Sequence, residues 1–96
     1  MPTTLRLITR DQNLNFHLPN VHVNNQTGQA ITFVRDGGEQ INVPVHNEYN
    51  LWLDGGLFRC VHYNNTNYYL PVLGPEPAQG AQVTVTAAEG QIHLTW

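Results

Sequence analysis

The sequence contains no serine, no lysine and a single cysteine, and each absence excludes a class of protein. Without serine, a Ser-His-Asp catalytic triad is impossible. With Cys60 alone, no disulfide can form within the chain. Its apolar neighbours in residues 57–61 predict a small buried hydrophobe rather than an activated nucleophile. Neither a P-loop nor a GxGxxG motif is present, so the sequence gives no sign of a nucleotide cofactor.

Charge is also scarce. Charged residues make up 11% of the chain, against about 25% in typical domains. The basic side chains are four arginines without a cluster, and the net charge is −3. Binding to nucleic acid or to an anionic membrane surface draws on clustered basic side chains, so neither partner is predicted. No apolar stretch approaches the roughly 20 residues that span a bilayer, and we therefore expect a soluble protein.

Side-chain amides take the place of charge. The chain has eleven asparagines and seven glutamines among its 96 residues. Asparagine tolerates the left-handed backbone conformation and bonds to its own backbone in turns, so most of these positions are expected in turns. The remaining amides would form a polar surface without strong electrostatic steering.

The dominant pattern is strict alternation of apolar and polar residues, as at Leu14, Phe16 and Leu18. This period of two predicts half-buried antiparallel strands, and no apolar helical pattern persists for ten residues, so essentially no helix is expected. About eight short strands are predicted, at 3–9, 14–23, 29–35, 39–46, 49–53, 57–63, 67–72 and 82–96, the last being a hairpin of two.

Turn residues separate these segments. Asp36-Gly37-Gly38 and Asp54-Gly55-Gly56 each predict a tight hairpin, and residues 64–67 and 88–90 predict two more. Pro44 cannot donate to a ladder, which indicates an edge strand or a bulge. The long segment 73–81 is expected to cross between sheets. Together these features predict one domain over residues 1–96, a small antiparallel β-sandwich or partly closed barrel with a meander-like order.

Five histidines raise the question of a metal site. The alternation predicts that His17, His22, His46 and His93 face outwards, and none of them forms the His-x-His pair that would converge on an ion. The carboxylates are isolated or explained by turns, so no general acid or base is apparent. We therefore predict no catalytic residues, no metal and no cofactor, and interpret the protein as a non-enzyme.

Aromatic rings beside amides suggest the function. Trp52 and Tyr69 each lie between apolar residues, so their side chains are expected on the opposite face of the strand from the apolar side chains. Residues 63–69 combine three tyrosines with three asparagines. Rings and amides together suit sugars or polar protein surfaces. The predicted ligand-binding residues are Trp52, Tyr63, Asn64, Asn65, Asn67 and Tyr69.

Two functional hypotheses follow from this composition. The first is a non-catalytic recognition module of the lectin or adhesin kind, binding a carbohydrate or polar surface. The alternative is a structural or protein-interaction subunit, such as a component of a viral or phage particle or an inhibitor, that self-associates as a homo-oligomer. In that case Trp52 and Tyr69 would pack in a second buried surface, because exposed aromatic patches mark interfaces.

Overall fold

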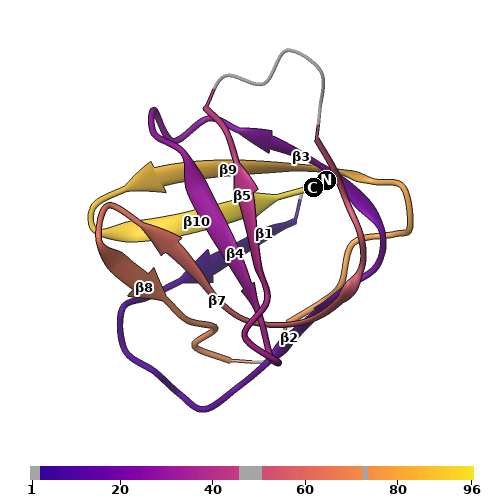
Figure 1. Ribbon diagram of the computed structural model, residues 1–96. Coiled ribbons are helices and arrows are strands. Elements are labelled where there is room, and N and C mark those ends of the chain that lie inside the picture. The colour runs from indigo at the N-terminus through magenta and orange to yellow at the C-terminus, as the bar shows by residue number, and fades with distance from the viewer. Residues whose placement is uncertain (1–2, 46–50, 73) are drawn as a thin grey trace.

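The computed structural model describes residues 3–45, 51–72 and 74–96, and these residues form two packed β-sheets (Figure 1). The first sheet has the order β1-β10-β9-β3-β6, and the second has the order β2-β7-β4-β5 with β8 also paired to β7. The strands are β1 (Thr4–Leu7), β2 (Phe16–Leu18), β3 (Val21–Asn25), β4 (Ile31–Arg35), β5 (Gln40–Val43), β6 (Leu51–Leu53), β7 (Gly56–Tyr63), β8 (Thr66–Tyr68), β9 (Gln82–Ala88) and β10 (Gln91–Thr95).

The core lies between the two sheets and contains the apolar phase of nearly every strand. In β9, for example, Val83 and Val85 are fully buried while Thr84 and Thr86 are partly exposed. This alternation places one face of each sheet inside and one in water. The predicted all-β class and sandwich architecture are confirmed, and the described residues contain no helix. Accordingly, they contain no helical segment able to cross a membrane.

The predicted single strand at 14–23 is wrong, because the chain changes sheet in its middle. Phe16–Leu18 forms β2 in the second sheet, whereas Val21–Asn25 forms β3 in the first. The buried positions shift from even numbers at Leu18 to odd numbers at Val21. A continuous strand would have kept the same parity, so this shift marks the crossing at residues 19–20.

The meander-like order is also wrong. Only the connections β4–β5, β7–β8 and β9–β10 join neighbouring strands of one sheet among the residues described. Every other connection between consecutive strands passes from one sheet to the other, and β3 pairs with β9 in parallel. At one corner a bridge between Ile8 and Tyr69 links the sheets, but the barrel does not close.

The two Asp-Gly-Gly segments have different structures. Asp36-Gly37-Gly38 forms the predicted β4–β5 hairpin, in which the Gly38 amide donates to the Arg35 carbonyl at 2.9 Å. Asp54-Gly55-Gly56 is not a hairpin, because β6 pairs with β3 and β7 belongs to the other sheet. It is a crossing between the sheets, and it packs against the β2–β3 crossing at residues 18–20.

Close backbone packing explains the glycine at position 55, in the crossing from β6 to β7. A Cβ atom on Gly55 would lie 2.6 Å from the Leu18 carbonyl oxygen and 2.9 Å from the Asn20 nitrogen. The Gly55 amide donates to Asn20 Oδ1 at 2.5 Å. Arg35 donates to the carbonyls of Asp54 and Gly55, each at 2.9 Å. Hydrogen bonds from two other segments therefore fix the position at which the chain enters β7.

Asn25 organises the crossing from β3 to β4. It is completely buried, and its Nδ2 donates to the carbonyls of Gln29 at 2.7 Å and Val43 at 3.2 Å. Its Oδ1 accepts from both the amide and the hydroxyl of Thr27. A buried amide is tolerated when each of its groups is paired, so this asparagine belongs to the fold rather than to the surface.

Two further predictions about connections are confirmed. Pro44 directly follows β5, which is an edge of the second sheet. Residues 74–81 pass from the second sheet, after β8, to β9 in the first sheet. This segment is held at its end by the Gly80 amide, which donates to the Asn20 carbonyl at 2.7 Å.

Candidate functional site

The six predicted binding residues are distributed over different parts of the surface. Trp52 lies on β6 at the edge of the first sheet, whereas the other five belong to the β7–β8 region of the second sheet. Trp52 is 46% exposed, as predicted, and its ring meets the edge of the His22 ring at 4.7 Å between centroids. It therefore does not join a continuous strip with residues 63–69.

Asn64 and Asn65 form the turn between β7 and β8. Their φ angles are 52° and 59°, and the flanking Tyr63 and Thr66 are paired across the hairpin. Two consecutive left-handed residues define a type I′ turn, which matches the twist of the strands it joins. Asparagine tolerates this left-handed backbone better than most other non-glycine residues, and both side chains are exposed.

The β9–β10 turn has the same geometry and lies beside the first one. Glu89 and Gly90 have φ angles of 54° and 73°, and Ala88 pairs with Gln91 across them. Figure 1 shows both turns projecting on the same side of the molecule. Between them is an open hollow of about 250 Å³, here called the turn hollow. Its lining residues are Tyr63, Asn64, Tyr68, Ala87, Ala88, Glu89, Gly90 and Gln91.

The tyrosines at the base of the turn hollow are held in place by the core. Tyr68 is buried, and its ring lies 6.2 Å from the Tyr63 ring. The Tyr63 hydroxyl donates to the Thr27 carbonyl at 3.3 Å. Tyr63 thus packs partly against the core and still presents part of its ring, while Asn64, Glu89 and Gln91 supply polar groups around it.

Asn67 belongs to a second concavity on the outer face of the second sheet, about 310 Å³ in volume. We call it the outer groove. His62 Nδ1 donates to Asn67 Oδ1 at 2.8 Å, which leaves the Asn67 amide nitrogen available. None of the groove side chains is a carboxylate or an arginine. Its lining residues are Thr32, Val34, Gln40, Cys60, His62 and Asn67.

Cys60 is buried in the floor of the outer groove, as the sequence predicted. Burial raises the pKa of its thiol above the ordinary value, and the nearby Arg59 guanidinium offsets only part of that effect. A raised thiol pKa reduces the fraction of reactive thiolate at neutral pH. The cysteine is therefore suited to packing.

Tyr69 has a neighbour on its ring face. The Arg59 guanidinium carbon lies 5.6 Å from the Tyr69 ring centroid, within the range of a cation–π contact. Arg59 is itself anchored by Asp11 Oδ2 at 2.6 Å. This arrangement fixes Tyr69 beside the loop that follows β1 and limits its use as a stacking surface.

The histidines are dispersed over the surface. His17 is exposed, and His22 and His93 are partly exposed, so their predicted outward orientation is confirmed. The prediction for His46 lies outside the described residues. Within those residues, no group of three or more histidine, cysteine, aspartate or glutamate side chains is placed to hold a metal ion.

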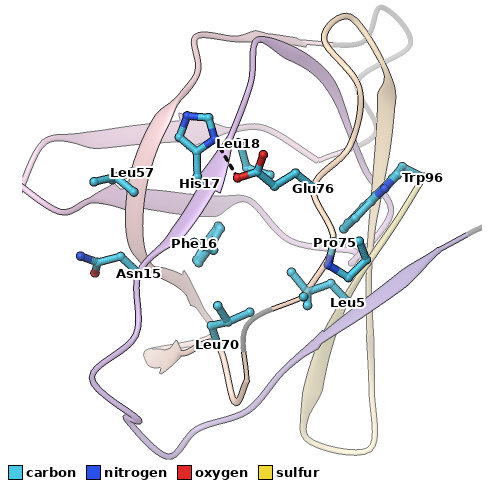
Figure 2. Close-up of a pocket in the computed structure, with 11 residues that line it drawn as sticks. Leu5, Asn15, Phe16, His17, Leu18, Leu57, Leu70, Pro75, Glu76 and Trp96 are labelled. Atoms are coloured by element: carbon cyan, nitrogen blue, oxygen red, sulfur yellow. Dashed lines mark hydrogen bonds and ion pairs between the residues drawn. The ribbon is translucent and has the colours of Figure 1, made fainter.

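A third concavity lies at the open end of the sandwich, between β1 and β2. This end cavity has a volume of about 120 Å³. Figure 2 shows its apolar base and, at its rim, a contact between His17 and Glu76 that measures 3.0 Å from Nδ1 to Oε1. The lining residues are Leu5, Asn15, Phe16, His17, Leu18, Leu57, Leu70, Gly74, Pro75, Glu76 and Trp96.

Sequence reasoning missed Glu89 and Gln91 in the turn hollow and Glu76 in the end cavity. The Ala88–Gly90 turn was predicted, but nothing in the sequence indicated that it would lie beside Asn64. For Glu76, the available signal was the unusual length of the segment at 73–81, because long connections often carry functional side chains.

Comparisons with known proteins give no match. No protein-family model matches the chain, and the comparisons with curated proteins and with solved structures found no match.

Proposed function

We propose that this protein is a non-catalytic recognition module that binds carbohydrate in the turn hollow. The observation that supports this proposal is the convergence of the partly exposed Tyr63 ring, two amides and one carboxylate on a single concavity, above the buried Tyr68. These groups are Tyr63, Asn64, Gln91 and Glu89. They lie in or next to two type I′ turns, whose backbone is fixed by the hairpins, so little backbone entropy is lost when a ligand binds.

The chemistry of these groups matches that of a sugar. Amides both donate and accept hydrogen bonds, a carboxylate accepts from paired hydroxyls, and an aromatic ring packs against the apolar face of a pyranose. No arginine lines the turn hollow, and the carboxylate of Glu89 would repel an anion. We therefore expect a neutral or amino sugar rather than a sulfated or sialylated one.

The proposal is tested by a glycan array followed by titration of the glycans that bind. Asn64→Gly keeps the left-handed turn and removes the amide, and should weaken binding about tenfold, the effect of losing a hydrogen bond made in a desolvated site. Asn65→Gly is the matched control, because Asn65 lies in the same turn but outside the lining of the hollow. It should leave the affinity unchanged.

Two results would overturn this function. One is the absence of any neutral or amino glycan bound by the wild-type protein across a broad array. The other is a glycan whose affinity responds equally to Asn64→Gly and Asn65→Gly, because that would place it outside the hollow. Unfolding curves for both variants establish that they retain the native fold.

A second candidate function is self-association through β5. This edge strand carries no charged side chain between Gln40 and Val43, and charged residues are the usual protection against edge-to-edge pairing. In the β4–β5 ladder, pairs with backbone hydrogen bonds alternate with pairs without them. Because the Arg35 amide donates to the Glu39 carbonyl, the pair that includes Asn42 is one without such bonds. The Asn42 amide therefore points away from β4.

Light scattering on the purified protein tests this second function. If β5 pairs with a second copy, the wild type is a dimer, and Asn42→Pro is a monomer because it removes an amide from the free edge. A wild type that remains monomeric at high micromolar concentration rules the β5 dimer out.

A further inference from the structure

We infer that the end cavity is a separate binding site for a small amphipathic amine, with a branched aliphatic group inside and the ammonium group at the rim. The site shares no residue with the turn hollow or the outer groove. Two observations carry the inference, namely the enclosed apolar base and the single carboxylate placed at its mouth.

The base of the end cavity suits a short apolar group. Phe16, Leu18 and Leu70 are buried and line it, together with Leu5 from the opposite sheet. Its volume of about 120 Å³ is slightly smaller than the roughly 150 Å³ cavity that holds a benzene molecule. A branched chain of four or five carbons therefore fits better than an aromatic ring.

The rim is polar and carries negative charge. His17 Nδ1 faces Glu76 Oε1 at 3.0 Å, so the imidazole donates to the carboxylate. In the neutral imidazole the other ring nitrogen is an acceptor, and Glu76 Oε2 is an acceptor as well. Both rim groups therefore favour a ligand that donates hydrogen bonds.

In the part of the chain that the structure describes, the side-chain partner of this carboxylate is His17, and no arginine pairs with it. Arg35 and Arg59 donate elsewhere, to Glu39 and Asp11. Arg6 lines an adjoining concavity that shares Leu5, Gly74 and Pro75 with the end cavity. Among the described residues that line the cavity, Glu76 is the one carboxylate. The complementary ligand group is an ammonium rather than a carboxylate.

Trp96 provides a reporter for the site. Its backbone continues the pairing of β1 with β10, since its amide donates to the Thr3 carbonyl at 2.9 Å. Figure 2 shows its ring on the same side of the cavity as Pro75. Because the sequence has two tryptophans, a Trp52→Phe background assigns the tryptophan fluorescence to Trp96 alone.

The test titrates 3-methylbutylamine against the Trp52→Phe protein at pH 8 and constant ionic strength. The matched probes are 3-methyl-1-butanol, which is neutral, and 4-methylpentanoate, which is anionic. The amine should saturate in the millimolar range expected of so few atoms, about threefold tighter than the alcohol. The carboxylate should bind more weakly than either.

Glu76→Gln should abolish the preference for the amine over the alcohol. Glu39→Gln, which removes an exposed carboxylate outside the cavity lining, should preserve it. Leu70→Phe should fill the cavity and prevent binding of both probes. The inference fails if amine, alcohol and carboxylate bind alike, if none of them binds, or if Glu76→Gln keeps the preference. None of these outcomes concerns the turn hollow, so the two proposals stand or fall separately.

Discussion

The chain contains the tripeptide Asp-Gly-Gly twice, and the two copies have different roles. At 36–38 it makes a hairpin within one sheet, and at 54–56 it carries the chain from one sheet to the other. Nothing lies within 4 Å of a Cβ built on Gly37, whereas one built on Gly55 meets the backbone at 2.6 Å. The same local sequence is thus explained by turn geometry in one copy and by close packing in the other.

The two copies are also connected. Arg35 immediately precedes the first copy and donates to carbonyls of the second, while its guanidinium carbon lies 4.9 Å from the Phe58 ring centroid. These contacts fix the start of β7, the strand that carries Cys60 and His62 to the outer groove and Tyr63 to the turn hollow. The packing of the crossing therefore supports the position of the candidate sites.

The largest effect is expected for Gly55→Ala. The added methyl group would overlap backbone atoms of residues 18–20 that cannot rotate away, so unfolding free energy should fall by about 3 kcal/mol. The matched control Gly37→Ala should change it by no more than about 0.5 kcal/mol, as for an open surface position. Urea unfolding of both variants measures the difference. Equal effects would show that the two copies play the same role.

Arg35→Ala should destabilise the protein by about 2 kcal/mol. It removes three hydrogen bonds from a charged group that is 19% exposed, together with the contact to Phe58. Arg35→Lys should recover less than half of the loss, because one ammonium cannot reproduce the planar fork that reaches two carbonyls. Full recovery by lysine would contradict the geometric role of the guanidinium.

Gly38→Ala should lower the unfolding free energy by about 1 kcal/mol. Gly38 has a φ of 94°, which an alanine adopts with strain, although the surrounding space is empty. Gly38→Asn should recover part of that loss, since asparagine tolerates left-handed backbone better. If Gly38→Ala proved as damaging as Gly55→Ala, the close backbone packing at Gly55 would not distinguish the two copies.

An effect as small as that of Gly38→Ala, about 1 kcal/mol, is expected for Asn20→Ala. It removes the acceptor for the Gly55 amide and leaves the backbone of the crossing in place. Asn24→Ala is the control, because the Asn24 side chain accepts its hydrogen bond from the exposed Gln26 amide and not from the crossing. Thermal unfolding that shifts by the same amount in both variants would show that the Asn20 bond contributes nothing specific.

The period of two was sufficient to predict the fold class, because a strand buried on one face must alternate. The alternation did not predict which of the two sheets each strand joins. The Asp54-Gly55-Gly56 crossing looks like a hairpin until β3 is known to pair with β6. The crossing at residues 19–20 could have been predicted, because the buried positions change from even numbers at Leu18 to odd numbers at Val21.

The candidate sites were less accessible to prediction. Turn chemistry located both Asn64-Asn65 and Glu89-Gly90, but their meeting depends on how the two sheets pack. The same holds for His17 and Glu76, which are 59 positions apart and meet only because residues 74–81 cross the end of the sandwich. Hydrogen bonding between distant residues leaves no local pattern in the sequence.

The most direct test of the recognition function is a two-dimensional ¹H–¹⁵N NMR titration of the labelled protein with the glycans that bind on the array. The account predicts saturable shifts concentrated at the side-chain amides of Asn64 and Gln91 and at the Gly90 backbone amide. Shifts that instead cluster around Trp52 on the opposite sheet, or a spectrum that no glycan changes, would contradict it.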